Sequence, residues 1–170
     1  MFAGTTHPLA VTLIALAYLW VAVASVALTV IDVRTHRLPN AWVVPGYPIV
    51  GGLMLLACLA GAPWASLLRA AIGGAALFVF YLLLRAAGGG MGGGDVKLAG
   101  VLGIALGWVG WSALAVGAVA GFVFGGLYGM LLLATRRAGR RTAVAFGPWM
   151  LVGAWTGIVW GASLVDRLGL

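Results

Sequence analysis

The chain has 170 residues, of which 64% are hydrophobic and 8% charged, whereas soluble domains carry about 25% charged residues. This composition excludes a soluble globular domain and predicts a single integral-membrane domain over residues 1–170. The net charge of +7 comes from ten basic residues against three acids. Because the basic residues flank apolar runs, we expect membrane lipids, not nucleic acid, to be their partners.

Six apolar runs predict six transmembrane helices, since about 20 apolar residues cross a hydrocarbon core of roughly 30 Å. The runs cover residues 8–31, 41–60, 66–84, 96–111, 113–134 and 147–165. The fourth run is the shortest. No basic segment precedes the first run and no clean small-residue cleavage site follows it, so we expect it to stay in the mature protein. The predicted fold class is therefore an all-α membrane protein, a six-helix bundle.

The basic residues predict how this bundle is oriented. With six crossings, eight of them lie on one side of the membrane, and only Arg69 and Arg167 lie on the other. The excess of positive charge in cytoplasmic loops then predicts a multi-pass protein of the inner (plasma) membrane, with both termini outside. The eight are Arg34, Arg37, Arg85, Lys97, Arg136, Arg137, Arg140 and Arg141.

Glycines recur at every fourth position in two of the predicted spans. Residues four apart share a helix face, and glycine lets two helix backbones approach closely. The pattern favours a tightly packed bundle, with homo-oligomerisation through the same faces as the alternative. The residues are Gly117, Gly121, Gly125 and Gly129 in the fifth span, and Gly153, Gly157 and Gly161 in the sixth.

Two of the three acids fall on the same predicted side of the membrane. Asp32 follows the first span and Asp95 precedes the fourth, which places both at the cytoplasmic face, while Asp166 lies outside. Charged groups in the membrane are costly, by about 2.5–3.5 kcal/mol at a helix centre, and they often mark functional sites. Each also has a structural alternative: Asp32 could end its helix, and Asp95 could be an N-cap that accepts backbone N–H bonds.

The segment before Asp95 contains six glycines in residues 88–94. It could be a flexible connection with little structural preference. A backbone without side chains could instead approach an extended peptide and pair with it as an added strand. Both interpretations remain open from the sequence.

Read together, the two aspartates predict acid–base chemistry. Two neighbouring carboxylates cannot both ionise easily, so one holds a proton while the other can activate water for attack on a peptide carbonyl. This chemistry requires neither a metal nor a cofactor. Cys58 is the only cysteine, which excludes a cysteine zinc site within one chain, and His7 lies on the outer side, away from the two aspartates. His36 is interpreted as a solvated or headgroup-facing residue.

Three segments resemble the type IV prepilin peptidase family of GxGD intramembrane aspartyl proteases. Residues 92–98 are similar to the family's GxGD-V-K-L motif, residues 32–40 to the segment that carries its first aspartate, and residues 146–148 to the Phe-Gly-Pro that opens its last helix. The resemblance implies that Asp32 and Asp95 are the catalytic pair. It also implies substrate-binding or site-shaping roles for Gly92, Gly94, Lys97, Pro39, Asn40, Gly147 and Pro148.

The same resemblance implies an endopeptidase that removes the basic leader of prepilin-like proteins of pilus or secretion systems, cutting after a glycine at the cytoplasmic face. Larger members also carry paired zinc-binding cysteines and an N-methyltransferase activity, so this sequence is expected to be the short, peptidase-only form. Two alternatives remain. One is a protease of the signal-peptide-peptidase type that cuts within a transmembrane segment, and the other is a proton-coupled transporter that uses the aspartate pair.

Overall fold

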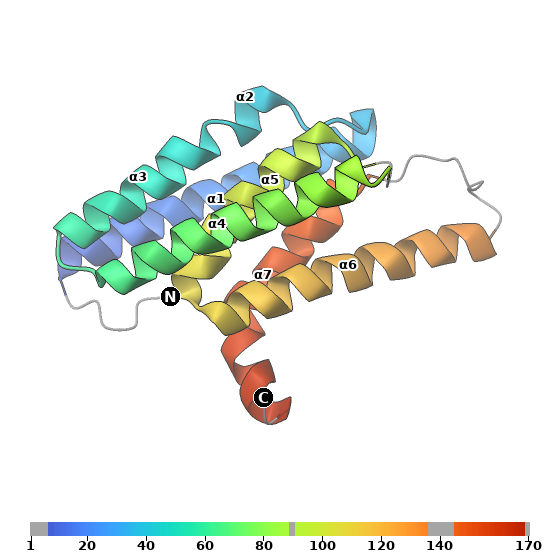
Figure 1. Cartoon of the computed structure of the whole chain (residues 1–170). Coiled ribbons are helices and arrows are strands. Elements are labelled where there is room, and N and C mark those ends of the chain that lie inside the picture. The colour runs from blue at the N-terminus through green and yellow to red at the C-terminus, as the bar shows by residue number, and fades with distance from the viewer. Residues whose placement is uncertain (1–6, 89–90, 136–144, 169–170) are drawn as a thin grey trace.

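The computed structural model describes residues 7–88, 91–135 and 145–168 (Figure 1). Within these ranges every regular element is a helix, which confirms the all-helical prediction. The four arginines at positions 136–141, on which half of the charge asymmetry depends, lie outside the described residues. The helices are α1 (Pro8–Thr35), α2 (Asn40–Val43), α3 (Gly46–Leu59), α4 (Trp64–Ala86), α5 (Gly93–Val109), α6 (Trp111–Ala134) and α7 (Gly147–Leu168).

Five segments of the described chain are long and apolar enough to cross a membrane. They are α1, the combined segment Asn40–Leu59, α4, Trp111–Leu132 of α6 and Gly147–Val165 of α7. The fourth predicted span corresponds to α5, which has 17 residues and a length of about 26 Å at 1.5 Å per residue. Six crossings therefore stay a prediction, whereas the structure supports a multi-pass membrane protein.

The segment predicted as one helix over residues 41–60 is divided by a turn at Val44 and Pro45. Neither Pro45 nor Pro48 has a backbone N–H, so Pro48 cannot donate the helical hydrogen bond to the carbonyl of Val44. The N–H of Tyr47 donates to that carbonyl instead, at 3.2 Å, in a tighter i to i+3 pattern. The short helix α2 is consequently set apart from α3 (Figure 1).

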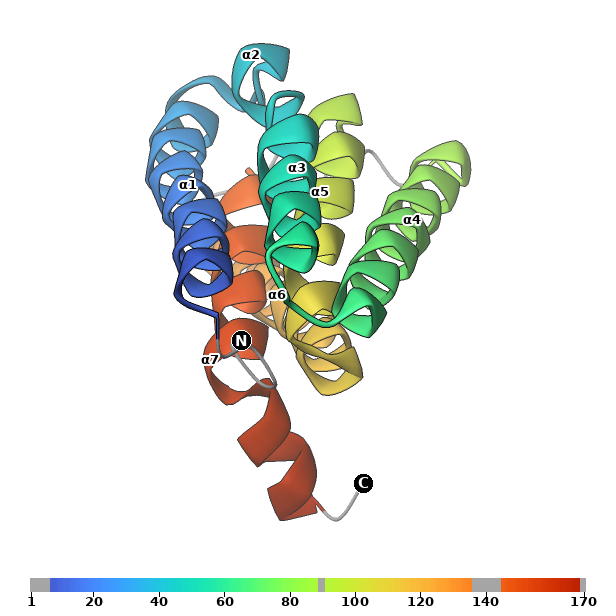
Figure 2. The ribbon, with the colours of Figure 1, turned by 90° about the vertical axis from the view of Figure 1, so that its left-hand side faces the viewer.

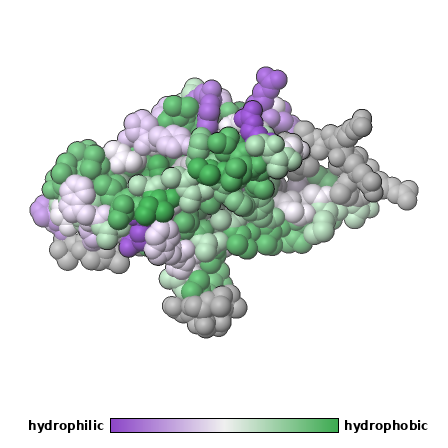
Figure 3. All heavy atoms as spheres, viewed as in Figure 1, coloured by the Kyte–Doolittle hydropathy of each residue, from purple (hydrophilic) through white to green (hydrophobic). Residues whose placement is uncertain are grey.

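Helix α5 lies at the centre of the molecule, where it contacts α2, α3, α4, α6 and α7 (Figures 1 and 2). Its side chains from Val96 to Trp108 are almost all buried, whereas the helices around it expose many large apolar side chains. A space-filling view shows a surface that is mostly apolar, with strongly hydrophilic side chains standing out over α2 and the connection before it (Figure 3). An apolar surface of this kind suits contact with lipid.

Glycines allow two pairs of helices to pack closely. Between α6 and α7, a Cβ added to Gly153 would meet the backbone of Gly121, and one added to Gly157 would meet Gly117. The predicted close packing of these spans is confirmed there, although a Cβ at Gly129 would meet nothing within 4 Å. A second pair, α4 and α5, was not predicted from the sequence; its contact residues are Gly73, Gly74, Gly100, Gly103 and Gly107.

Candidate active site

Asp32 lies in the last turn of α1 and is only 4% exposed. The helix was predicted to end at residue 31, but it continues to Thr35. His36 then closes it in the left-handed conformation, with φ 52° and ψ 35°, and donates its N–H to the carbonyl of Asp32 at 2.8 Å. The alternative in which Asp32 ends the helix is therefore wrong. A buried carboxyl group inside a helix needs a hydrogen-bond partner.

That partner is the first residue of α7. The N–H of Gly147 donates to Oδ2 of Asp32 at 3.0 Å, and a Cβ on Gly147 would lie 2.7 Å from the same oxygen. Glycine is therefore the residue that lets the carboxyl group come this close. Pro148 follows at the start of the helix, where the missing N–H of proline has no intrahelical partner to lose. Phe146 packs beside the rings of Tyr81 and Phe122 and so holds the entry to α7 in place.

Asp95 is the third residue of α5, and its Oδ2 accepts the N–H of Gly92 at 3.1 Å. Gly92, and not Asp95, occupies the N-cap position, which corrects the predicted N-cap. Asp95 lies just before the apolar run that starts at Val96. Burial raises the pKa of its carboxyl group to about 6, the charge of Asp32 raises it as well, and the hydrogen bond from Gly92 lowers it.

The two glycines directly before Asp95 form the beginning of α5 and lie close to other parts of the chain. Gly93 and Gly94 are helical, so this part of the segment is not a flexible connection. A Cβ on Gly94 would lie 2.6 Å from the Cβ of Leu38, and one on Gly93 would collide with the guanidinium group of Arg85. Gly92 has extended backbone angles, with φ −68° and ψ 147°. A small residue is therefore needed at Gly94, where the backbone and Cβ of Leu38 pass close by, whereas at Gly93 the exposed side chain of Arg85 could move aside.

Asp32 and Asp95 line the same cavity, which has a volume of about 230 Å³. A cavity needs only about 10–15 Å³ to hold one water molecule, so this one has room for water beside a bound group. Its remaining lining comes from two basic residues, one leucine and three glycines. The full lining is Asp32, His36, Arg37, Leu38, Gly92, Gly93, Gly94 and Asp95.

The structure brings some of the other predicted site residues to the cavity and leaves the rest beside it. Gly92 and Gly94 line it, and Gly147 holds Asp32. Lys97 and Asn40 do not line it; they bind each other, with Nζ of Lys97 donating to Oδ1 of Asn40 at 2.9 Å. Pro39 is the residue before α2 and Pro148 is the second residue of α7.

Four residues that line the cavity were not predicted as site residues: His36, Arg37, Leu38 and Gly93, which lies between the two predicted glycines. His36 was expected to face solvent or headgroups, yet its side chain lines the cavity while remaining exposed. The only signal for it in the sequence is its spacing of four residues from Asp32, which would share a face with it if the helix continued. Arg37 and Leu38 follow the end of α1, so the helical spacing of residues no longer predicts which way their side chains face. Their contribution depends on the path of the connection, which the sequence does not reveal.

Comparisons with known proteins identify the family of the chain. The sequence model of the type IV leader peptidase family matches residues 9–134, which include both aspartates. Three similar proteins all carry the name prepilin leader peptidase/N-methyltransferase. The one from Stutzerimonas stutzeri is 32% identical over 81% of this chain and 47% of its own length. The one from Pseudomonas putida is 33% identical over 84% and 50%, and the one from Aeromonas salmonicida is 33% identical over 90% and 51%.

The chain is thus a helical membrane protein with two carboxyl groups in one cavity near a helix end. It belongs to the type IV leader peptidase family. It spans about half the length of the curated relatives that it matches. No solved structure matches it significantly.

Proposed function

We propose that this chain is a membrane-embedded aspartic endopeptidase that removes the basic leader peptide of type IV prepilin-like proteins. The observation that carries the proposal is the common cavity of Asp32 and Asp95, two acids 63 positions apart in a chain with only three acids. Family membership and the names of the relatives support the substrate class. The proposal concerns peptide cleavage alone.

In the proposed mechanism the two carboxyl groups share one proton. The ionised group removes a proton from water, which attacks the scissile carbonyl, while the protonated group polarises that carbonyl and then protonates the leaving nitrogen. Hydrogen bonds from Gly147 and Gly92 each fix one carboxyl group before substrate arrives. Since the pKa of Asp95 is raised to about 6, the pair loses its shared proton above that pH, and cleavage declines as pH rises further.

We also propose six crossings, both termini outside, and a site at the cytoplasmic face of the inner membrane. In this arrangement α5 is a short crossing that reaches the interface at Asp95. The cavity and the basic residues Arg34 and Arg37 then share one side, as the charge asymmetry of cytoplasmic loops requires. Cleavage after a glycine is what the resemblance to the family implies. In the proposed topology a leader with basic residues would remain in the cytoplasm while the apolar helix after it stays in the membrane.

The test is leader removal from a prepilin-like protein that is co-expressed with the chain. Wild-type chain should shorten the substrate by its leader, and Asp32→Ala and Asp95→Ala should each abolish this. Asp32→Asn and Asp95→Asn keep the shape of each side chain and should be equally inactive, because an amide cannot exchange the proton. Asp166→Ala is the matched control, since it removes the third acid of the sequence, and it should process normally. Full processing by either aspartate variant would overturn the proposal.

Mapping the new N-terminus separates the alternatives. Cleavage directly after the leader glycine supports the prepilin-type reaction, whereas cleavage inside the apolar helix would assign the chain to the signal-peptide-peptidase type. Aspartate-dependent proton flux into vesicles without any cleavage would indicate a transporter instead.

A further inference from the structure

Residues 38–43, hereafter the strap, connect α1 to α3 and include the short helix α2. The strap contacts both α1 and α5, the two helices that carry the aspartates. Figures 1 and 2 show α2 at one end of the molecule, apart from the axis of α3. It does not itself supply a carboxyl group. Three contacts of the strap with the helices around it indicate its structural role.

The first contact ties the strap to α5 beside Asp95. Nζ of Lys97 donates to Oδ1 of Asn40 at 2.9 Å, and Lys97 is two residues after Asp95. The hydroxyl of Tyr47 donates to the carbonyl of Lys97 at 2.7 Å, so the start of α3 holds the same turn of α5. Asn40 itself is exposed and packs against little else. Its hydrogen bond is therefore the main link that it provides.

The second contact is made by Leu38, which lies between a neighbour of Asp95 and the hydrogen-bond partner of Asp32. Leu38 lies against Gly94, where an added Cβ would be 2.6 Å from its Cβ, and against Gly147, where an added Cβ would be 3.2 Å from its Cδ2. Gly94 is next to Asp95, and Gly147 donates to Asp32. The side chain of Leu38 thus contacts the start of α5 beside Asp95 and the start of α7 beside Asp32.

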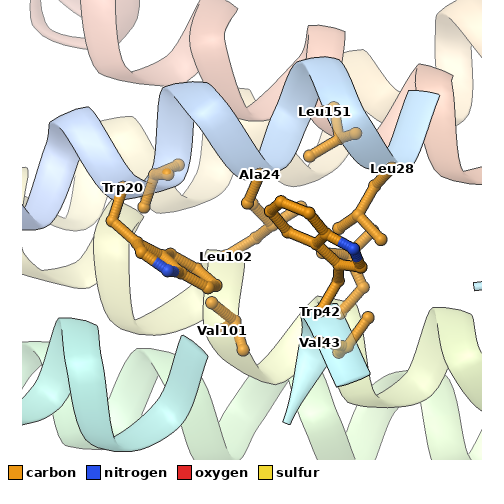
Figure 4. A pocket seen from close by; sticks show the side chains of 10 residues that line it. Trp20, Ala24, Leu28, Trp42, Val43, Val101, Leu102 and Leu151 are labelled. Carbon is orange, nitrogen blue, oxygen red and sulfur yellow. The ribbon is translucent and has the colours of Figure 1, made fainter. Parts of the chain in front are cut away.

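The third contact ties the strap to α1 near Asp32. Trp42 and Val43 line a narrow apolar crevice together with Leu28, which lies one helical turn before Asp32. Figure 4 shows the indole of Trp42 directed from α2 toward α1, beside Leu28, with Trp20 at the other end of the same crevice. The crevice has a volume of only about 10 Å³ and Val43 is 1% exposed, so Val43 is packed tightly against the helices. Trp42 covers the crevice from outside and is 37% exposed.

From these contacts we propose that the strap fixes the position of Asp95 relative to Asp32, with Trp42 and Asn40 as positioning residues. The inference rests on the proposed peptidase function. An error of about 1 Å in the placement of reacting groups can cost about 100-fold in rate. The two helices carry the carboxyl groups near their ends, where a single anchor would leave them free to tilt apart. The strap supplies an anchor on each helix.

The test measures kcat and KM for cleavage of a synthetic prepilin-like peptide by the full chain in detergent, across a range of pH. Trp42→Ala and Asn40→Ala are expected to lower kcat at least tenfold and to change KM less than threefold. Separation and hydration of the carboxyl groups should also move the decline in activity from about pH 6 toward lower pH. Trp42→Phe keeps an apolar ring in the crevice and should restore kcat to within threefold of wild type.

The matched control is Trp20→Ala, which removes the other indole from the same crevice but leaves the strap intact. It should lower thermal stability about as much as Trp42→Ala while leaving kcat and the pH profile within twofold of wild type. Equal effects of Trp20→Ala and Trp42→Ala on kcat would overturn the inference, because they would reveal loss of packing only. Wild-type kcat and pH profile in Asn40→Ala would overturn it as well. Absence of cleavage by wild-type chain would instead overturn the proposed function.

Discussion

Gly147→Ala tests how closely Asp32 is held. The added methyl group would lie 2.7 Å from Oδ2 of Asp32 and 3.2 Å from Cδ2 of Leu38, so the start of α7 must move. That movement weakens the 3.0 Å hydrogen bond on which the buried carboxyl group depends. Losing a hydrogen bond to a charged group costs about 1.5–3 kcal/mol, and overpacking costs about 1–3 kcal/mol.

Together these effects predict destabilisation of about 3 kcal/mol. For a chain of this size, each 1 kcal/mol lowers the midpoint of thermal unfolding by roughly 2–4 °C, so we expect a decrease of about 6–12 °C. Cleavage should fall about 100-fold, because Asp32 no longer faces the scissile bond at the required angle. The assay is peptide cleavage by purified chain, with activity normalised to the folded fraction measured in the same sample.

Gly52→Ala is the matched control. Gly52 lies inside α3, where an added Cβ meets nothing within 4 Å. Alanine is favoured over glycine in a helix interior by about 1 kcal/mol, so this variant should be unchanged or slightly more stable and fully active. If Gly147→Ala retained the activity and midpoint of Gly52→Ala, the close approach of Asp32 to α7 would be refuted.

Three other perturbations test the site and its supports. Burial and the charge of Asp32 raise the pKa of Asp95 from 3.8 to about 6, so the stability of the chain should fall as pH rises through this window and then level off. Asp95→Asn should reduce this slope and raise stability at pH 8 by about 1–2 kcal/mol in thermal unfolding; an unchanged slope would contradict the assignment. Gly153→Val should unfold at a lower temperature than Gly129→Val, because a side chain at Gly153 meets the backbone of α6 whereas one at Gly129 meets nothing; equal midpoints would speak against the close packing of α6 and α7. His36→Gly should raise the midpoint by roughly 2–4 °C, since glycine relieves about 1 kcal/mol of left-handed strain, and a lower midpoint would mean that the His36 side chain stabilises the end of α1.

The sequence was sufficient to predict the helical class and the meeting of Asp32 and Asp95. Apolar runs mark helices because every backbone group must be satisfied within the membrane. Counting crossings from each run then places the two acids on one side. The repeated spacing of Gly117, Gly121 and Gly153 was likewise visible, because each repeat stays on one face of its own helix.

Other features could not be predicted because they depend on partners from distant parts of the chain. Gly73 and Gly74 have no fourfold spacing, and their role emerges only when α4 is placed beside Gly103 of α5. The central position of α5 could not be predicted for a second reason. In a membrane protein, residues that face lipid and residues that face the core are equally apolar, so hydrophobicity does not distinguish them. The break between α2 and α3 at Pro45 could not be predicted because apolar residues continue on both sides of it.

The two glycine contacts join helices that are consecutive in the chain, α4 with α5 and α6 with α7. If α5 crosses the membrane as proposed, each pair can enter the membrane as a hairpin during synthesis. For α5 this order matters, because a helix of 17 residues is short for insertion alone and gains from the longer α4 beside it. Asp95 then enters at the turn of the first hairpin, while the N–H that holds Asp32 arrives only with the second. In the proposed topology the carboxyl pair is therefore completed only after α7, which carries the N–H of Gly147, has been inserted.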